Sequence, residues 1–117
     1  MQVQVNSNQS VETREAMERW AEAEIRKTLD RFSAEVTRVE VHLGDENADK
    51  GGTGDKRCTM EARLANHQPV AVTEHAPTID AAFHGAAGKL KRMLDSIVGK
   101  MTTHRDRQTI RTVADDV

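Results

Sequence analysis

One long apolar stripe between Thr78 and Arg107 constrains the fold more than any other feature of the chain. Its members recur every three or four residues: Ile79, Phe83, Ala86, Leu90, Leu94, Ile97 and Met101. This interval places them on one side of an α-helix. Pro77 precedes the stripe, at a position where a helix start tolerates proline. Gly85, Gly88 and Gly99 each lower helix propensity by about 1 kcal/mol. The helix must therefore be stabilised by the surface that covers its apolar side.

The same predicted helix has a cationic flank. With a rotation of about 100° per residue, one flank beside the stripe carries Lys89, Arg92, Ser96, Lys100, Thr103 and Arg107. No acid lies among them, and the other flank carries Asp80, Asp95 and Asp106. Such a flank would suit a phosphate backbone. A solvated charged face is the common alternative, and spacing alone leaves both interpretations open.

Charge is divided unevenly along the chain, although the net charge of 117 residues is only −2. Residues 1–75 carry 10 basic and 14 acidic side chains, whereas residues 76–111 carry 7 basic and 3 acidic ones. The overall charge therefore says nothing about nucleic acid, but its distribution permits a local basic patch.

Composition excludes several classes of protein. Cys58 is the only cysteine, which rules out an intramolecular disulfide and fits a reducing cytoplasm. No apolar run approaches the ~18 residues of a membrane helix, and the N-terminus lacks the features of a signal peptide. The chain has no tyrosine, and its only Trp and Phe residues are Trp20, Phe32 and Phe83. These are too few to form a stacking platform for single-stranded nucleic acid. We therefore expect a cytoplasmic protein without a membrane partner.

The rest of the chain predicts four strands and one further helix. Apolar and polar residues alternate in four segments, Met1–Ser7, Val36–Leu43, Lys56–Ala65 and Val70–Glu74. A helix is predicted from Val11 to about Arg31, because Ser10 is a good N-cap and apolar residues then recur about every four positions. Trp20 lies at the edge of this second stripe, so we interpret it as a core-rim residue rather than a binding group. The glycine-rich segment 44–55 is predicted to be a mobile loop.

The predicted order is β-α-β-β-β-α, an α+β fold with a four-stranded mixed sheet. A right-handed β-α-β crossover makes the first two strands parallel, and short connections make the remaining pairs antiparallel. Each strand has one apolar face, so both helices should cover the same face of the sheet.

No set of residues predicts catalysis. The segment 51–56, Gly-Gly-Thr-Gly-Asp-Lys, lacks the spacing of a phosphate loop and leads into a strand. The five histidines and the loop acids lack the spacing of zinc or calcium ligands. Cys58 alternates with predicted core residues and has no obvious base. We therefore expect no enzyme activity, no metal, no cofactor and no small-molecule substrate.

The order and spacing of several segments resemble the short ribosome hibernation-promoting factors, the family of ribosome-associated inhibitors once called sigma-54 modulation proteins. The resemblance covers roughly residues 1–107. It is carried by Met1-Gln-Val-Gln-Val5, Val11-Glu-Thr-Arg-Glu-Ala16, Arg38-Val-Glu-Val-His-Leu43, Thr78-Ile-Asp-Ala-Ala82, Lys89-Leu-Lys-Arg-Met-Leu94, Lys100 and His104. It implies one ribosome-associated domain over residues 1–107, similar in fold to a double-stranded RNA-binding domain. Residues 108–117 would then form a polar, flexible tail.

The resemblance also implies a function. Members bind the small ribosomal subunit between its head and body, contact 16S rRNA and block the mRNA and tRNA sites in stationary phase or stress, without catalysis. Carried over by position, the rRNA-binding residues are Lys89, Arg92 and Lys100, with Arg26 and Lys27 on the first helix. Lys91 lies within the matching segment, and Arg107 continues the cationic flank.

One departure from the family pattern leaves an alternative open. After Leu94 the family usually continues with a dense run of lysine and arginine, whereas this chain reads Asp95-Ser-Ile-Val-Gly99. Each lost phosphate contact reduces both affinity and its salt dependence. The alternative is a protein-interaction module that has kept the fold and lost rRNA binding. The sequence leaves the oligomeric state open.

Overall fold

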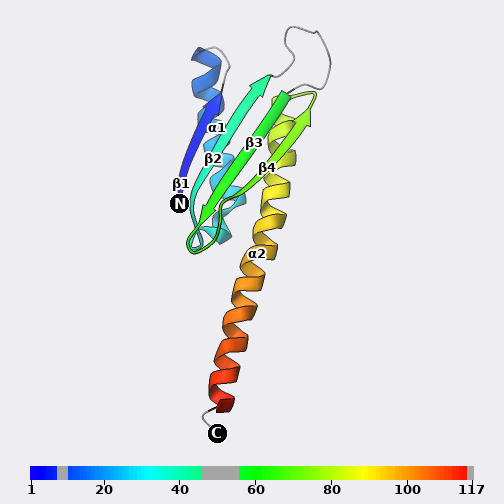
Figure 1. Ribbon diagram of the computed structural model, residues 1–117. Helices are drawn as coiled ribbons and strands as arrows, with labels where there is room; N and C mark the ends of the chain where they lie inside the picture. Colours follow the sequence, from blue (N-terminus) through cyan, green and yellow to red (C-terminus); the bar gives the residue numbers. More distant parts are fainter. Residues whose placement is uncertain (8–10, 46–55, 116–117) are drawn as a thin grey trace.

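Four strands form one mixed sheet in the order β1-β2-β3-β4 (Figure 1). The computed structural model describes the backbone of residues 1–7, 11–45 and 56–115, and the side chains of residues 1–7, 14–44 and 56–100. The strands are β1 (Gln2–Ser7), β2 (Val36–Asp45), β3 (Lys56–Leu64) and β4 (Val70–Ala76). β1 is parallel to β2, and the other two pairs are antiparallel. The predicted strand order and directions are confirmed.

Both helices lie on one face of this sheet, as predicted (Figure 1). α1 (Val11–Thr28) packs against β1, and α2 (Ile79–Asp115) packs against β3 and β4. α1 ends slightly before the predicted Arg31 and is followed by a short 3₁₀ helix, η1 (Asp30–Phe32). This tighter turn directs Phe32 into the core, where only 3% of it is exposed.

The core lies between the sheet and the helices. The alternation in β3 illustrates this arrangement. Cys58, Met60 and Ala62 are fully buried, whereas the residues between them are partly exposed. The same core includes Ile25 from α1 and Leu29, which lies between α1 and η1. From α2 come Phe83, Ala86, Leu90 and Leu94, all at 0% exposure. These four belong to the apolar stripe that predicted the helix.

α2 continues further than the sequence predicted. The expected end was Arg107, but the helix runs to Asp115 and projects past the sheet (Figure 1). The chain contains no glycine or proline after Gly99, so nothing in its sequence forces the helix to stop. The projection makes the molecule 69 Å long but only 24 and 19 Å across. The division into a domain over residues 1–107 and a tail over residues 108–117 stays a prediction.

Two smaller features complete the fold. The predicted turn between β3 and β4 contains Asn66 at φ 63°, a left-handed conformation that asparagine tolerates better than most residues. The predicted loop over residues 44–55 lies outside the described residues from position 46 onward. Among the helices of the described chain, none is long and apolar enough to cross a bilayer.

Candidate nucleic-acid interface

Lys89, the first predicted rRNA contact, is bound to the sheet. Its Nζ donates a hydrogen bond to the backbone oxygen of Thr73 at 3.1 Å and lies 3.5 Å from Oε2 of Glu74. Gly85, one turn earlier on α2, leaves room for this arrangement, because a Cβ there would lie 2.7 Å from Cγ of Glu74. Lys89 therefore fastens α2 to strand β4, and its charge has a carboxylate beside it.

Arg26 connects the other helix, α1, to the opposite edge of the sheet. Its Nη1 donates to the backbone oxygen of Met1 at 3.0 Å, and its Nε donates to Oε1 of Glu22 at 3.2 Å. The contact with Met1 links α1 to the start of β1. Since β1 and β4 are the two edge strands of the sheet, Arg26 and Lys89 each connect a helix to one edge.

The other predicted cations whose side chains are described lie in solvent. Lys27, Lys91, Arg92 and Lys100 are exposed. Within the part of the chain whose side chains are described, these four make no hydrogen bond or ion pair. We call them the exposed cations. Arg107 was also predicted, but its side chain lies outside the described residues. The exposed cations therefore need not break a contact with any described side chain before they approach a phosphate.

Arg31 is a cation near the helices that the sequence did not single out. Its guanidinium forms an ion pair with Asp95 of α2 and lies 4.8 Å from the ring centre of Phe32. Asp95 is the acid that interrupts the expected basic run. Its charge is thus neutralised by an arginine far away in sequence, and local spacing could not have predicted that pair.

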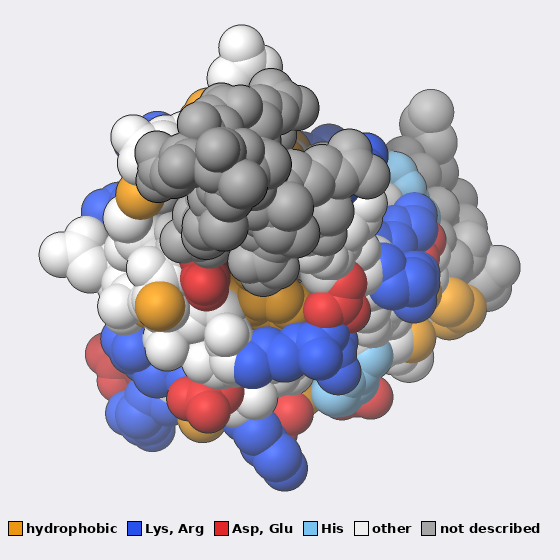
Figure 2. Space-filling model, turned by 90° about the horizontal axis from the view of Figure 1, so that it is seen from below, with side chains coloured by type: hydrophobic (Ala, Val, Ile, Leu, Met, Phe, Trp, Pro, Cys, Tyr) orange, Lys and Arg blue, Asp and Glu red, His pale blue; other side chains and the backbone are white. Residues whose placement is uncertain are grey.

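Charge on the molecule is mixed. Figure 2, which looks from below the view of Figure 1, shows Lys and Arg side chains alternating with Asp and Glu side chains. Several cations of the described chain form ion pairs, including Arg14–Glu18, Arg26–Glu22 and Arg31–Asp95. Such exposed pairs contribute little to stability, but they reduce the positive potential that a polyanion would meet.

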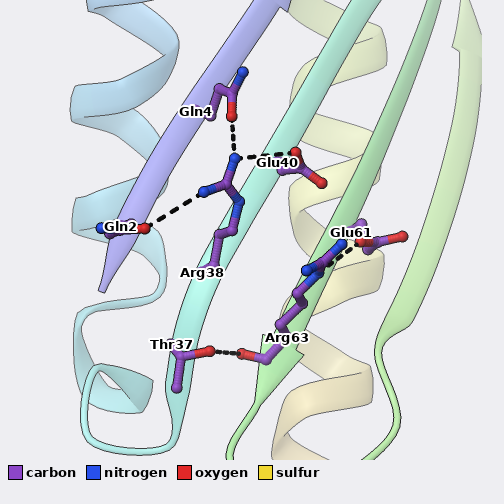
Figure 3. Close-up of polar contacts among 7 residues, drawn as sticks. All are labelled: Gln2, Gln4, Thr37, Arg38, Glu40, Glu61 and Arg63. Carbon is purple, nitrogen blue, oxygen red and sulfur yellow. Dashed lines mark hydrogen bonds and ion pairs between the residues drawn. The ribbon is translucent and has the colours of Figure 1, made fainter.

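The open face of the sheet carries Arg38 and Arg63, and both have partners. Arg38 donates to Gln2 at 3.4 Å, to Gln4, and to Glu40 at 3.2 Å (Figure 3). Arg63 stands opposite Arg38 on the neighbouring strand.

Arg63 also has partners on this face. Its Nε donates to Oε1 of Glu61 at 3.2 Å, and its backbone oxygen accepts a hydrogen bond from Oγ1 of Thr37 at 3.0 Å (Figure 3). Two like charges facing each other across strands would be destabilising. Here each arginine has a carboxylate two residues away on its own strand. The charges of these two arginines are therefore balanced, and a phosphate would compete with the carboxylates of Glu40 and Glu61.

The structure offers no obvious catalytic or metal site in its described residues. No group of three His, Cys, Asp or Glu side chains there could hold a metal ion. Burial raises the pKa of the Cys58 thiol to about 12, so the thiol stays protonated near neutral pH. A protonated, buried thiol is a poor nucleophile.

A hollow of about 390 Å³ lies between α1 and the start of α2. It is lined by Ala16, Met17, Trp20, Ile79 and Asp80. Trp20 is only partly buried and packs against the core, as its predicted position at the rim implied. The hollow is mostly apolar, with one carboxylate among its lining residues.

Comparisons with known proteins agree with the fold. The family model described as Sigma 54 modulation protein / S30EA ribosomal protein matches residues 3–102. The crystal structure of the Thermus thermophilus Protein Y N-terminal domain is 18% identical, with a TM-score of 0.64 over 83% of this chain and 99% of that chain. A ribosomal subunit interface protein from Coxiella burnetii is 15% identical, with a TM-score of 0.62 over 85% of this chain and 99% of its own. No curated protein sequence matches the chain. At these identities the two structures establish a shared fold.

Proposed function

The chain belongs to the sigma 54 modulation protein / S30EA ribosomal protein family, a family of ribosome-associated factors rather than enzymes, and from this premise we propose that it binds the small ribosomal subunit. The proposed ligand is 16S rRNA, and the proposed effect is steric. A rigid domain occupies the sites of mRNA and tRNA and silences translation in stationary phase or stress. The proposed binding takes place in the cytoplasm, where ribosomes translate mRNA.

One observation supports the helix side as the rRNA-binding surface. The exposed cations have no partner among the described residues, whereas Arg38 and Arg63 on the open sheet face are hydrogen-bonded to amides and carboxylates. Phosphate contacts from lysine and arginine position a protein on RNA but carry no sequence information. The proposal therefore predicts that the shape and charge of the domain, rather than the base sequence, determine its position on the rRNA.

We propose different roles for different members of the predicted set. We assign the phosphate contacts to Lys27, Lys91, Arg92 and Lys100, and we keep Arg107 as a proposed contact on the projecting part of α2. Lys89 and Arg26 hold the helices to the sheet edges. Their contribution to rRNA binding is then mainly to fix the positions of the exposed cations.

Co-sedimentation with purified small subunits tests this proposal. The variant Lys91→Glu/Arg92→Glu/Lys100→Glu should lose at least about 100-fold in affinity at low salt, because three phosphate contacts become repulsive. Its free energy of unfolding should stay within about 1 kcal/mol of the parent, because all three residues are exposed. Arg63→Glu is the matched control, an exposed arginine on the open sheet face whose reversal should leave sedimentation unchanged. Normal sedimentation of the triple variant would contradict the proposal.

A second candidate is a protein-interaction module of the same fold that no longer binds rRNA. The ion pairs that neutralise Lys89 and Arg31 favour it, because they reduce the net cationic surface. It predicts that a nuclease-treated pull-down recovers a protein partner and that untreated eluate contains no rRNA. Sucrose-gradient fractionation of starved cells, with the protein followed by immunoblot, separates the two candidates. The first candidate function predicts that the protein sediments with ribosomes, and the second predicts that it stays in lighter fractions.

A further inference from the structure

Four charges lie side by side at the centre of the open sheet face. Arg38 and Glu40 belong to β2, and Arg63 and Glu61 belong to β3, the two inner strands of the sheet (Figure 3). The register places Arg38 opposite Arg63 and Glu40 opposite Glu61. We call these four residues the charge quartet. Their charges form two short rows of opposite sign, which are about 7 Å apart along the strands.

This arrangement is not the one that best stabilises an isolated sheet. Like charges directly opposite each other on neighbouring strands are unfavourable, whereas opposite charges there attract. Each arginine is instead compensated along its own strand: Nη2 of Arg38 lies 3.2 Å from Oε1 of Glu40, and Nε of Arg63 lies 3.2 Å from Oε1 of Glu61. The quartet therefore has no net charge, but it has a positive side and a negative side.

The quartet keeps hydrogen-bonding capacity for a partner. Within the described chain, the side chain of Arg63 donates through Nε alone, so both of its terminal nitrogens stay available. Among the same residues, Glu40 and Glu61 each accept through Oε1 only. The side chains of Arg63 and Glu61 are 56% and 35% exposed, so a second molecule can reach them.

The neighbours of the quartet on this face leave it accessible. Gln2 and Gln4 of β1 lie beside the two rows, and Ala71 of β4 extends the glutamate row. The next row toward the far end of the sheet contains the hydroxyls of Thr59 and Thr73, which are hydrogen-bonded to each other. These five neighbours are neutral, and three of them are short. A flat surface can therefore approach the two rows.

A second copy of the same face is the complement of this pattern. A two-fold axis that is parallel to the rows and midway between them places the arginine row of one copy over the glutamate row of the other. Arg38 then faces Glu40 of the second copy, and Arg63 faces Glu61 of the second copy. Each contact occurs twice by symmetry. The strands of the two copies run antiparallel, within the offset of about 30° that twisted sheets adopt when they stack.

Other occupants match the two rows less well. A phosphate backbone or an acidic surface would be attracted by the arginine row and repelled by the glutamate row beside it, and a basic surface would meet the reverse. An apolar surface would bury four charges without offering them a partner. The complementary partner must carry two rows of opposite charge at the same spacing, and this chain carries them itself.

We propose that the open sheet face is a self-association surface, through which two copies of this chain pair quartet against quartet. The contacts are polar and involve one face of a small sheet, so the dimer belongs to the weak class of interfaces and forms at high protein concentration. Two-fold pairing is closed, so association stops at the dimer. The exposed cations lie on the helices, on the other side of the sheet (Figure 1). Pairing therefore leaves them uncovered, and this inference does not depend on the proposed function.

Sedimentation equilibrium of the full chain at low salt, from about 10 µM to about 1 mM, measures the association. The parent protein should form a dimer in the upper part of this range. Added salt should weaken the dimer, because its contacts join exposed charges. A parent protein that stays monomeric throughout, or a dimer that salt does not weaken, would overturn the inference.

Two single substitutions on β3 test the quartet itself. Arg63→Glu and Glu61→Arg should each weaken self-association at least tenfold or so, because an attraction becomes a repulsion at two places in the dimer. An equimolar mixture of the two variants should associate at least as tightly as the parent, because a doubly acidic β3 then faces a doubly basic one. A mixture that does not recover association would overturn the proposed arrangement.

Matched substitutions on α1 control for net charge. Arg19→Glu and Glu15→Arg change the net charge by the same amounts at exposed positions on the helix side of the sheet, and both should associate like the parent. Loss of association in these variants would show that net charge decides it, which would overturn the inference. Circular dichroism checks that every variant is folded. Arg63→Gln adds no like charge to its strand and should still weaken association about threefold, so it tests the same contact if Arg63→Glu does not fold.

The outcome is separable from the proposed function. Parent protein that sediments with small subunits but stays monomeric up to about 1 mM would refute self-association and leave ribosome binding intact. Parent protein that dimerises but does not sediment with small subunits would refute the proposed function and support the paired sheet faces.

Discussion

Lys89 and Arg92 lie less than one turn apart on α2, yet they belong to different regions of the molecule. Lys89 is bound to Thr73 and Glu74 of the edge strand β4, whereas Arg92 is exposed with no ion pair to any described residue. The sequence placed both on one cationic flank. Helical spacing therefore locates a charge on α2, but the neighbouring strand decides whether that charge is available.

Reversing the charge of Lys89 should destabilise the protein far more than reversing the charge of Arg92. Lys89→Glu removes the hydrogen bond to Thr73 and places a second carboxylate beside Glu74, so it should lower the free energy of unfolding by about 2 kcal/mol. Arg92→Glu should change it by less than about 0.5 kcal/mol. Urea denaturation followed by circular dichroism measures both. Equal effects at the two positions would remove the distinction between a structural and an exposed cation.

Exchanging the charges of the pair should restore part of the loss. In Glu74→Lys/Lys89→Glu the two side chains again attract, so we expect about 1 kcal/mol to return relative to Lys89→Glu alone. The hydrogen bond to the Thr73 backbone stays lost. Glu74→Lys alone, which places two cations together, completes the double-mutant cycle. A cycle with no coupling energy would show that the two charges act independently.

Replacing Arg92 alone should have a moderate effect on binding to small subunits. Arg92→Gln removes one proposed phosphate contact, so affinity for small subunits should fall several-fold. The slope of log K against log salt should become shallower by about 0.7 to 0.9. Lys89→Gln is the comparison, because Lys89 already has protein partners, and its slope should stay close to that of the parent. A larger change for Lys89 than for Arg92 would reverse the assignment of roles.

The smallest expected effect is at Asp95. Asp95→Asn frees Arg31 from its ion pair, and this exposed pair should be worth no more than about 1 kcal/mol of stability. Affinity for small subunits should rise about two- to threefold, because one more cation faces the RNA. Ser96→Asn, a neighbouring exposed position on α2, controls for the substitution itself. Weaker binding by Asp95→Asn would show that the carboxylate contributes to the interface.

The sequence predicted the fold well because the fold depends on periodicity. Alternation in β3 identified its buried face, and the stripe from Ile79 to Leu94 identified the side of α2 that packs on the sheet. These patterns are local and repeat several times. The right-handed crossover rule then gave the parallel pairing of β1 and β2, which the register confirms.

The candidate interface was less predictable because it depends on contacts between distant residues. Nothing near Lys89 in sequence shows that Glu74 will lie beside it, since that contact requires β4 to pair at the edge of the sheet. Arg31 and Asp95 meet for a similar reason. The hollow beside Trp20 also needs two helices from opposite ends of the chain. The end of α2 was missed because a polar helix that leaves the core has no apolar stripe to mark its length.

The attachment of Lys89 to β4 has a consequence for the behaviour of the protein at high concentration. An outer strand with free backbone groups invites another chain to pair with it and begin aggregation, and lysine is one of the residues that discourage this. A strand arriving from a second molecule would first have to displace the ammonium group from Thr73. The same side chain that orients a helix can thus help keep the protein monodisperse when it accumulates.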